Sequence, residues 1–231
     1  MELEGILEGH CIGELLSDGI MNFEKQNKEL LESLRIEGIK DKAILNAMEK
    51  IPRHLFVGEE NIGKAYTDRP LSIGYGATIS QPYTVAFMLE KLELKKGLNV
   101  LEVGTGSGWN ASLIAYIINP GKVYTTEIVP ELSEFAKKNI DKVNIKNIEI
   151  IQTKELGYRK AMPYDRIIVT AASKDIPQEL TDQLKDNGIM LIPVDSKYEN
   201  GYQDMIKVRK FKDRIEKEDL KYTFLFVPLK S

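Results

Sequence analysis

The sequence contains very few of the residues that form disulfides or bind metals through nitrogen and sulfur. Cys11 is the single cysteine in 231 residues, which excludes an internal disulfide and suits a reducing compartment. His10 and His54 are the only histidines. With one cysteine they make no credible cluster of nitrogen and sulfur ligands, so we predict that the protein has no metal site.

The chain also lacks long apolar runs and an excess of positive charge. Apolar runs such as 189–194 are too short to span a bilayer, and residues 1–20 lack the basic start of a secretory signal. The formal net charge is −3, so no basic field suggests binding to nucleic acid. We expect a cytoplasmic monomer with no nucleic-acid or membrane partner, and a hydrophobic content of 42% suffices for its core.

The most informative stretch is 100–108, with the sequence VLEVGTGSG. The pattern predicts a buried strand over 99–103, a turn with three glycines, and a helix over 109–118. Glycine has no Cβ, so a ligand can lie against the main chain at such a turn. The next strand ends at Glu127, nineteen positions after Gly108. Because an acid at about that distance commonly binds ribose hydroxyls, the pattern predicts a nucleoside cofactor.

The glycine spacing differs from that of dinucleotide-binding proteins. Their pattern is G-x-G-x-x-G, whereas this chain has E-x-G-x-G-x-G beginning at Glu102. A carboxylate before the first glycine suits a cation better than a pyrophosphate. S-adenosylmethionine carries an ammonium and a sulfonium group, so we predict that it is the cofactor. The alternative is an ordinary α/β turn, in which Glu102 and Glu127 are merely residues at strand ends.

Residues 65–83 form a second candidate site. This polar segment, interrupted by glycine and proline, is long for a connection, and long loops in compact domains usually carry function. We expect a helix from Pro82 to about residue 94, with Ser80 or Gln81 near its cap. The hydroxyls of Thr78 and Ser80 and the free N–H groups of the helix start would suit an anion. Alternatively, Ser80 is only a helix cap. His54 lies among apolar neighbours, and we expect it to be structural.

Strand and helix patterns alternate along the chain, which predicts an α/β fold with a doubly wound, mostly parallel sheet and N-terminal helices packed on it. We interpret 204–211 and 220–229 as an antiparallel hairpin with a charged turn at 212–219. We expect residues 1–20 to be a dispensable extension, with translation starting at Met21, and 21–231 to be one domain. Expected helices are 22–35, 42–51, 82–94, 109–118, one from Pro130, and 176–184; expected strands are 99–103, 122–126, 148–151, 164–172 and 188–194.

From about Leu34 to Leu229, the sequence resembles the protein-L-isoaspartate (D-aspartate) O-methyltransferase family. The glycine turn alone would indicate only a class I methyltransferase. The segment Thr78-Ile-Ser-Gln-Pro82, in order with the other motifs, is far more specific. The resemblance depends on IPRHLFV at 51–57, AYTDRPL at 65–71, ATISQPY at 77–83, LEVGTGSG at 101–108, PYDRIIVTAA at 163–172 and FVPL at 226–229.

The resemblance implies a Rossmann-like sheet with reversed final strands. It also implies methyl transfer from S-adenosylmethionine to the α-carboxylate of L-isoaspartyl and D-aspartyl residues in damaged proteins. Ser80 matches the active-site serine, and Thr78, Ile79, Ser80 and Val227 match residues at the peptide substrate. We expect the cofactor at Ala77, Thr78, Ile79, Ser80, Glu102, Gly104, Thr105, Gly106, Ser107, Gly108, Glu127, Ile128, Thr153 and Lys154.

The sequence departs from the family after the third strand. Members usually have Gly-Asp-Gly there, where the acid holds the edge of the adenine, but this chain has Gln152-Thr-Lys154. Thr153 still offers a hydroxyl group. The departure leaves two alternatives open. One is a carboxyl methyltransferase that modifies aspartate in a dedicated peptide or another acceptor. The other is a non-catalytic relative with weakened cofactor binding.

Overall fold

The computed structural model describes residues 22–212 and 214–229. The expected N-terminal extension, His10, Cys11 and the suggested start at Met21 therefore lie outside the described residues. None of the helices in the described ranges is both long and apolar enough to cross a membrane.

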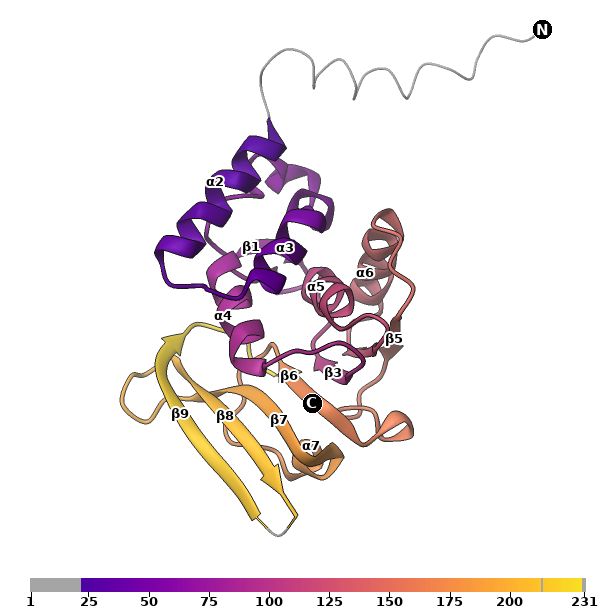
Figure 1. The fold of residues 1–231 in the computed structure, drawn as a ribbon, viewed down its shortest axis with the longest axis vertical. Coiled ribbons are helices and arrows are strands. Elements are labelled where there is room, and N and C mark those ends of the chain that lie inside the picture. The colour runs from indigo at the N-terminus through magenta and orange to yellow at the C-terminus, as the bar shows by residue number, and fades with distance from the viewer. Residues whose placement is uncertain (1–21, 213, 230–231) are drawn as a thin grey trace, which may run out of the picture.

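The described part of the chain begins with two α-helices, α2 (Phe23–Ile36) and α3 (Lys42–Lys50). Each begins where a side chain accepts a hydrogen bond from a backbone amide of the first turn. The caps are Asn22 for α2 and Asp41 for α3, as the sequence predicts for Asp41. The buried faces of both helices belong to the same apolar core as α5 (Trp109–Ile118). Figure 1 shows the two helices stacked above α4 and α5 at one end of the molecule.

Residues 65–83 contain more structure than the sequence predicts. After the short helices η1 (Arg53–Phe56) and η2 (Glu59–Lys64), the strands β1 (Leu71–Gly74) and β2 (Ala77–Ile79) form a small antiparallel sheet. Its turn passes through Gly74, Tyr75 and Gly76, all with positive φ, which glycine tolerates without steric cost. The chain then enters α4 (Pro82–Leu92), with proline in the first turn as expected.

The main sheet has seven strands in the order β5-β4-β3-β6-β7-β8-β9. Strands β3 to β7 are parallel, and β8 runs antiparallel to both of its neighbours. This arrangement confirms the predicted fold class. The strands are β3 (Asn99–Val103), β4 (Lys122–Glu127), β5 (Ile148–Gln152), β6 (Tyr164–Val169), β7 (Leu184–Asp195), β8 (Gln203–Phe211) and β9 (Arg214–Phe224).

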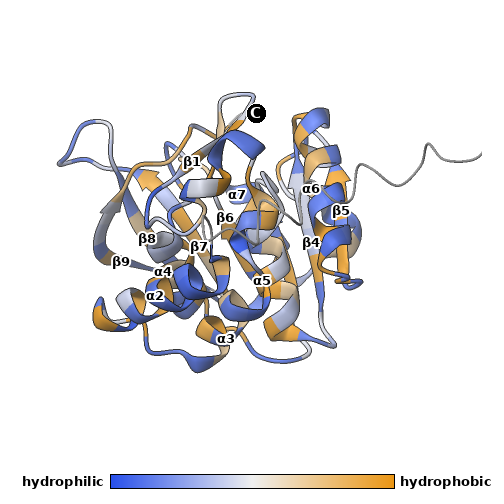
Figure 2. Ribbon diagram, turned by 90° about the horizontal axis from the view of Figure 1, so that it is seen from above, coloured by the Kyte–Doolittle hydropathy of each residue, from blue (hydrophilic) through white to orange (hydrophobic). Residues whose placement is uncertain are grey.

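Apolar layers cover both faces of the sheet. On one face, Val100 of β3 joins the core formed with α4, α5 and α6 (Pro130–Lys142). On the other face, Leu101 and Val103 join the core that contains Leu180 of the short helix α7 (Gln178–Gln183). Figure 2 shows apolar residues concentrated on β6, on β7 and along α5. Because the central strands are buried on both faces, they appear in the sequence as nearly continuous apolar runs.

The C-terminal hairpin is present, but its predicted turn is wrong. Residues 214–219 belong to β9 and pair with β8, so that Glu216 lies opposite Arg209 and Glu218 opposite Lys207. The turn is therefore much shorter than 212–219. β9 is a solvent-facing edge strand, where charged side chains are tolerated, and their density imitates a loop.

Other boundaries also differ from the prediction. β6 ends at Val169 rather than residue 172, β7 begins at Leu184 rather than residue 188, and α7 is shorter than 176–184. β9 ends at Phe224, so residues 225–229 lie beyond it.

Candidate functional site

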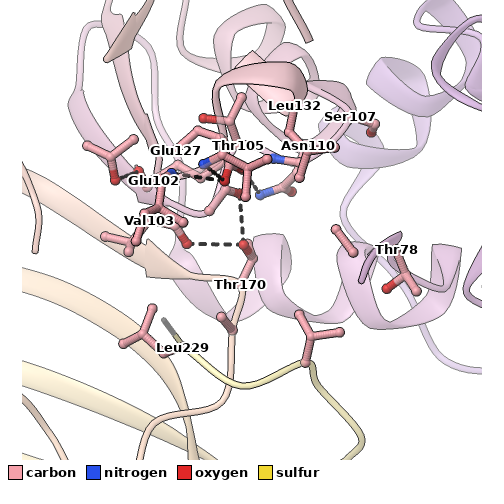
Figure 3. Close-up of a pocket in the computed structure, with 18 of the residues that line it drawn as sticks. Thr78, Glu102, Val103, Thr105, Ser107, Asn110, Glu127, Leu132, Thr170 and Leu229 are labelled. Atoms are coloured by element: carbon pink, nitrogen blue, oxygen red, sulfur yellow. Dashed lines mark hydrogen bonds between the residues drawn. The ribbon is translucent and has the colours of Figure 1, made fainter. Parts of the chain in front are cut away.

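One pocket lies at the carboxyl ends of β3 and β6 and collects residues from distant parts of the chain. The strand order reverses between these two strands, because the chain runs from β3 out to β5 and returns on the other side. Ligands of open α/β sheets bind at such a position. Every predicted site residue except Gly108 lines this pocket. In Figure 3, Glu102, Thr105 and Glu127 cluster on one side, with Thr78 apart from them.

The glycine turn is held by the side chain of the residue that follows β6, Thr170. The Thr170 hydroxyl donates to the carbonyl oxygens of Val103 and Gly104, at 3.1 and 2.9 Å. Gly104 has a φ of +101°, and a Cβ there would clash with Thr170 Oγ1. The turn therefore needs glycine for both its backbone conformation and its packing. Sequence reasoning missed Thr170 because its role depends on a contact between residues that are far apart in the chain.

Gly108 has a different role from the other two glycines. It lies outside the pocket lining, with a φ of +83° at the start of α5. A Cβ there would come within 3.0 Å of Ile140 and 3.2 Å of Ala136, both on α6. Gly108 therefore allows α5 to pack closely against α6.

Glu102 is completely buried on β3, with hydrogen bonds to both carboxylate oxygens. Asn110 Nδ2 donates to Oε1 at 2.7 Å, and the hydroxyl of Thr125, the opposite residue in β4, donates to Oε2. Thr125 in turn accepts a hydrogen bond from the Thr105 hydroxyl at 2.8 Å, because its own proton is donated to Glu102. Burial raises the pKa of Glu102 to about 7; the two hydrogen bonds oppose this shift, and the nearby Glu127 carboxylate adds to it.

Glu127 at the end of β4 binds the main chain of the glycine turn. Its Oε2 accepts from the Gly106 amide at 3.0 Å, and its Oε1 accepts from the amides of Ile128 and Val129 at 2.9 and 3.1 Å. The side chain is almost fully buried, and Oε2 retains a lone pair. Together with Glu102 it makes this side of the pocket electronegative, which favours a cationic ligand.

The structure revises the prediction for the helix start after Ser80. The Tyr83 amide is not free, because it donates to Asp68 Oδ1 at 2.8 Å, and Gln81 Nε2 donates to Asp68 Oδ2 at 2.7 Å. The anion site expected from free helix amides is therefore wrong at Tyr83. The cap position of α4 is Gln81, without a side-chain cap hydrogen bond. Within the described residues, the Ser80 hydroxyl forms no hydrogen bond and lines the pocket, so it does not serve as a helix cap.

Arg53 fixes the main chain at Ser80. Its guanidinium donates to the carbonyl oxygens of Ala65, Arg69 and Ser80, the last two at 3.1 Å. Only 1% of the surface of residue Arg53 is exposed to solvent. The orientation of the Ser80 segment is therefore set by a buried side chain from η1, which the sequence analysis did not identify.

Val227 lines the pocket from the C-terminal segment, beyond the end of β9. Its carbonyl oxygen accepts from the Ala172 amide at 2.8 Å, and the Leu229 amide donates to the Ala172 carbonyl oxygen at 2.8 Å. The segment therefore pairs with the chain that follows β6, in a parallel bridge between Ala172 and Pro228. The expectation that Val227 lies within a strand is wrong, although its main chain is extended alongside the pocket.

His54 lies outside the pocket lining. Its ring stacks on Phe23 with a centroid distance of 4.1 Å, and its Nδ1 shares a hydrogen bond with the Tyr66 hydroxyl at 2.7 Å. Burial lowers the pKa of His54, which favours a neutral ring at physiological pH. These contacts agree with the structural role expected for this residue. Within 22–212 and 214–229, no group of three or more His, Cys, Asp or Glu residues could hold a metal ion.

The comparison with protein families assigns most of the chain to a known family. The model of the family described as protein-L-isoaspartate(D-aspartate) O-methyltransferase matches residues 25–231. The chain belongs to this family.

Members from distant organisms align over most of their length. The protein-L-isoaspartate O-methyltransferase of Ignicoccus hospitalis is 48% identical over 190 residues, covering 81% of this chain and 89% of the relative. That of Dictyoglomus thermophilum is 44% identical over 210 residues, covering 90% and 93%. A solved structure from Plasmodium falciparum, described as a family member in complex with S-adenosyl-L-homocysteine, has a TM-score of 0.79 at 31% identity and covers 88% of this chain and 98% of its own.

The position where this member departs from the usual family sequence also lies in the pocket. Thr153 and Lys154 line it, together with Glu155, which the sequence analysis did not identify. The Thr153 amide donates to the Glu127 carbonyl oxygen at 2.9 Å, and the Thr153 hydroxyl accepts from the Glu155 amide at 3.0 Å. The turn is therefore tied to the end of β4, and Glu155 returns a carboxylate to this part of the lining.

Proposed function

We propose that this protein transfers a methyl group from S-adenosylmethionine to the α-carboxylate of L-isoaspartyl residues, and to the free carboxylate of D-aspartyl residues, in damaged proteins. The observation that carries this proposal is that the glycine turn at 104–106 and the segment with Ser80 line one continuous pocket. A cofactor at the turn and an acceptor at Ser80 would therefore face each other. Membership of the isoaspartate methyltransferase family supports the same reaction.

The residues of the pocket fit the cofactor. Glu102 and Glu127 place negative charge beside the glycine turn, and S-adenosylmethionine carries two cationic groups. The missing Cβ at Gly104 makes room for Thr170 Oγ1, which holds the main chain of the turn beside the pocket. When bound, the cofactor supplies a methyl group that its sulfonium has already activated for transfer. We propose that Glu127 binds the ribose hydroxyls and that Thr153 and Lys154 lie at the adenine end.

The chain's own residues would bind and orient the acceptor. The free carboxyl group of such a residue, with a pKa near 4, is ionised at neutral pH, so it is already a nucleophile. We propose that the unpaired Ser80 hydroxyl donates a hydrogen bond to this carboxylate and orients one oxygen toward the methyl carbon. A neutral donor weakens the nucleophile less than a lysine or arginine would. Correct alignment of the reacting atoms can supply roughly 7–11 kcal/mol of the barrier reduction.

The substrate is proposed to be an extended polypeptide segment that lies along Thr78, Ile79 and Val227. The amide of Val227 forms no hydrogen bond within the described residues, whereas its carbonyl oxygen is bound to Ala172. Pairing with main chain would make recognition largely independent of the neighbouring side chains. We also propose that the protein is a cytoplasmic monomer. Its substrates are proposed to be proteins rather than nucleic acids, because the formal net charge of −3 does not favour binding to nucleic acid.

The decisive experiment measures transfer of a labelled methyl group to two peptides that differ only in one isoaspartyl or aspartyl linkage. The proposal expects methylation of the isoaspartyl peptide alone. Methylation of neither peptide, with S-adenosylhomocysteine bound, would favour another acceptor or a dedicated peptide. Absence of cofactor binding in calorimetry would favour a non-catalytic relative.

Ser80→Ala tests the role of the hydroxyl. Loss of a hydrogen bond to a charged group should lower kcat about ten- to hundredfold while cofactor affinity stays nearly constant. Ser33→Ala is the matched control, because Ser33 lies on α2 and bonds to Glu37 instead. Full activity of Ser80→Ala would show that this hydroxyl does not orient the acceptor.

A further inference from the structure

Asn110 has one amide atom in use and one without a partner. It lies in the first turn of α5 and lines the pocket. Its Nδ2 donates to Glu102 Oε1 at 2.7 Å, but its Oδ1 is buried without a hydrogen bond from any described residue. Figure 3 shows Asn110 beside Glu102 on the same side of the pocket as Glu127. A buried carbonyl oxygen without a donor is costly, so this atom calls for an explanation.

The neighbouring carboxylate fixes the orientation of the amide. A bound cation favours the ionised form of Glu102, which can only accept hydrogen bonds, so the NH₂ group of Asn110 then faces Glu102. The carbonyl oxygen of the amide is therefore turned away from Glu102. What completes this group must be a hydrogen-bond donor that reaches the pocket, since the side chain itself lines it.

The charges around Asn110 favour a cationic donor. Glu102 is fully buried, and among the described residues the charged side chain that perturbs it is another acid, Glu127. The positive end of the helix α5 dipole would normally repel a cation at its first turn. A buried carboxylate in contact with Asn110 offsets this repulsion. An ammonium group supplies both the hydrogen-bond donor and the charge that the two acids lack.

We propose that the Asn110 carboxamide oxygen accepts a hydrogen bond from the α-ammonium group of S-adenosylmethionine, while Glu102 supplies the opposing charge. This inference rests on the proposed use of that cofactor and extends it to a residue outside the glycine motif. Asn110 thus has two roles. Its NH₂ group holds the carboxylate of Glu102, and its oxygen binds the cofactor directly.

The test compares two ligands by calorimetry. One is S-adenosylhomocysteine, and the other is its deamino analogue, in which hydrogen replaces the α-ammonium. Asn110→Ala should weaken binding of S-adenosylhomocysteine about ten- to hundredfold and leave the analogue's Kd nearly unchanged. Binding of the analogue also shows that the variant is folded. Asn147→Ala is the matched control, because this amide bonds only to the Ala115 and Gly121 carbonyl oxygens and lies outside the pocket.

The same substitution in a Glu102→Ala background separates direct contact from an indirect effect. If Asn110 binds the ammonium itself, its removal still weakens S-adenosylhomocysteine several-fold in that background. If the loss disappears there, Asn110 acts only by holding Glu102 and the inference is wrong. An equal loss for both ligands, or no loss, overturns it as well. Failure of the unmodified protein to bind S-adenosylhomocysteine would instead overturn the proposed function together with this inference.

Discussion

The buried carboxyl group of Glu102 should make the unliganded protein less stable as the pH rises. Its folded-state pKa of about 7 lies above the ordinary value of 4.5, because burial disfavours the charged form. The folded chain therefore holds this proton more tightly than the unfolded chain. The resulting stability is complete below pH 4.5 and is lost as the pH rises through 7.

The size of this effect follows from the two pKa values. Between pH 5 and pH 8, Glu102 should lower the free energy of unfolding by about 2 to 3 kcal/mol. Glu102→Gln removes the titration but keeps an acceptor for Asn110. The Thr125 hydroxyl can then accept from the new amide and donate to Thr105, since either hydroxyl can be the donor in that pair. The variant should therefore gain stability relative to the parent protein as the pH rises.

The assay is urea-induced unfolding of both proteins from pH 5 to pH 8 without cofactor. The difference in unfolding free energy should widen by about 2 to 3 kcal/mol, or roughly 4 to 12 °C in Tm. Glu134→Gln is the control, because Glu134 is exposed on α6. A difference between Glu102→Gln and the parent that stays constant over this range would refute the reasoning.

Three further substitutions test other parts of the site. Gly104→Ala should destabilise the protein by about 2 to 5 kcal/mol from backbone strain and the clash with Thr170, and by only about 1 to 2 kcal/mol in a Thr170→Ala background, measured by calorimetric unfolding. Val227→Pro should raise the peptide KM without changing cofactor Kd, whereas Val227→Ala keeps the amide and should bind peptide normally; equal kinetics in both would exclude main-chain pairing. Arg53→Lys replaces the two terminal guanidinium nitrogens that reach the three carbonyl groups with a single nitrogen, so kcat should fall more than cofactor affinity, and parallel losses would indicate a general folding defect.

The fold was predictable where burial controls the sequence. β3 and β6 lie in the middle of the sheet, so they bury apolar side chains on both faces and the strand pattern is clear. The edge strand β9 follows no such rule, because its exposed side chains carry charge and resemble those of a loop. β1 and β2 were missed for a related reason, since strands this short and partly exposed have no readable period.

The site was predictable only where one short segment contains the chemistry. The glycine turn and its preceding Glu102 form such a segment, and the motif around Ser80 is another. Thr170 was missed because the contact that gives it a role spans 66 positions. Asn110 did leave a signal, since it is a polar residue in the first turn of a largely buried helix. Asp68 left one too, as the only acid between residues 65 and 83.

Arg53 explains why the separate motifs of this family occur together. Its guanidinium binds the carbonyl oxygens of Ala65, Arg69 and Ser80, which lie in two different motifs, while Arg53 itself lies in a third. It also lies over the ring of Trp109, 5.4 Å from the centroid, and Trp109 begins the helix after the glycine turn. Arginine alone among the side chains presents a planar fork of donors that can serve several carbonyl groups and stack on an aromatic ring. One buried cation therefore connects the acceptor segment to the cofactor turn, and altering any of these motifs should disturb the relative position of the two.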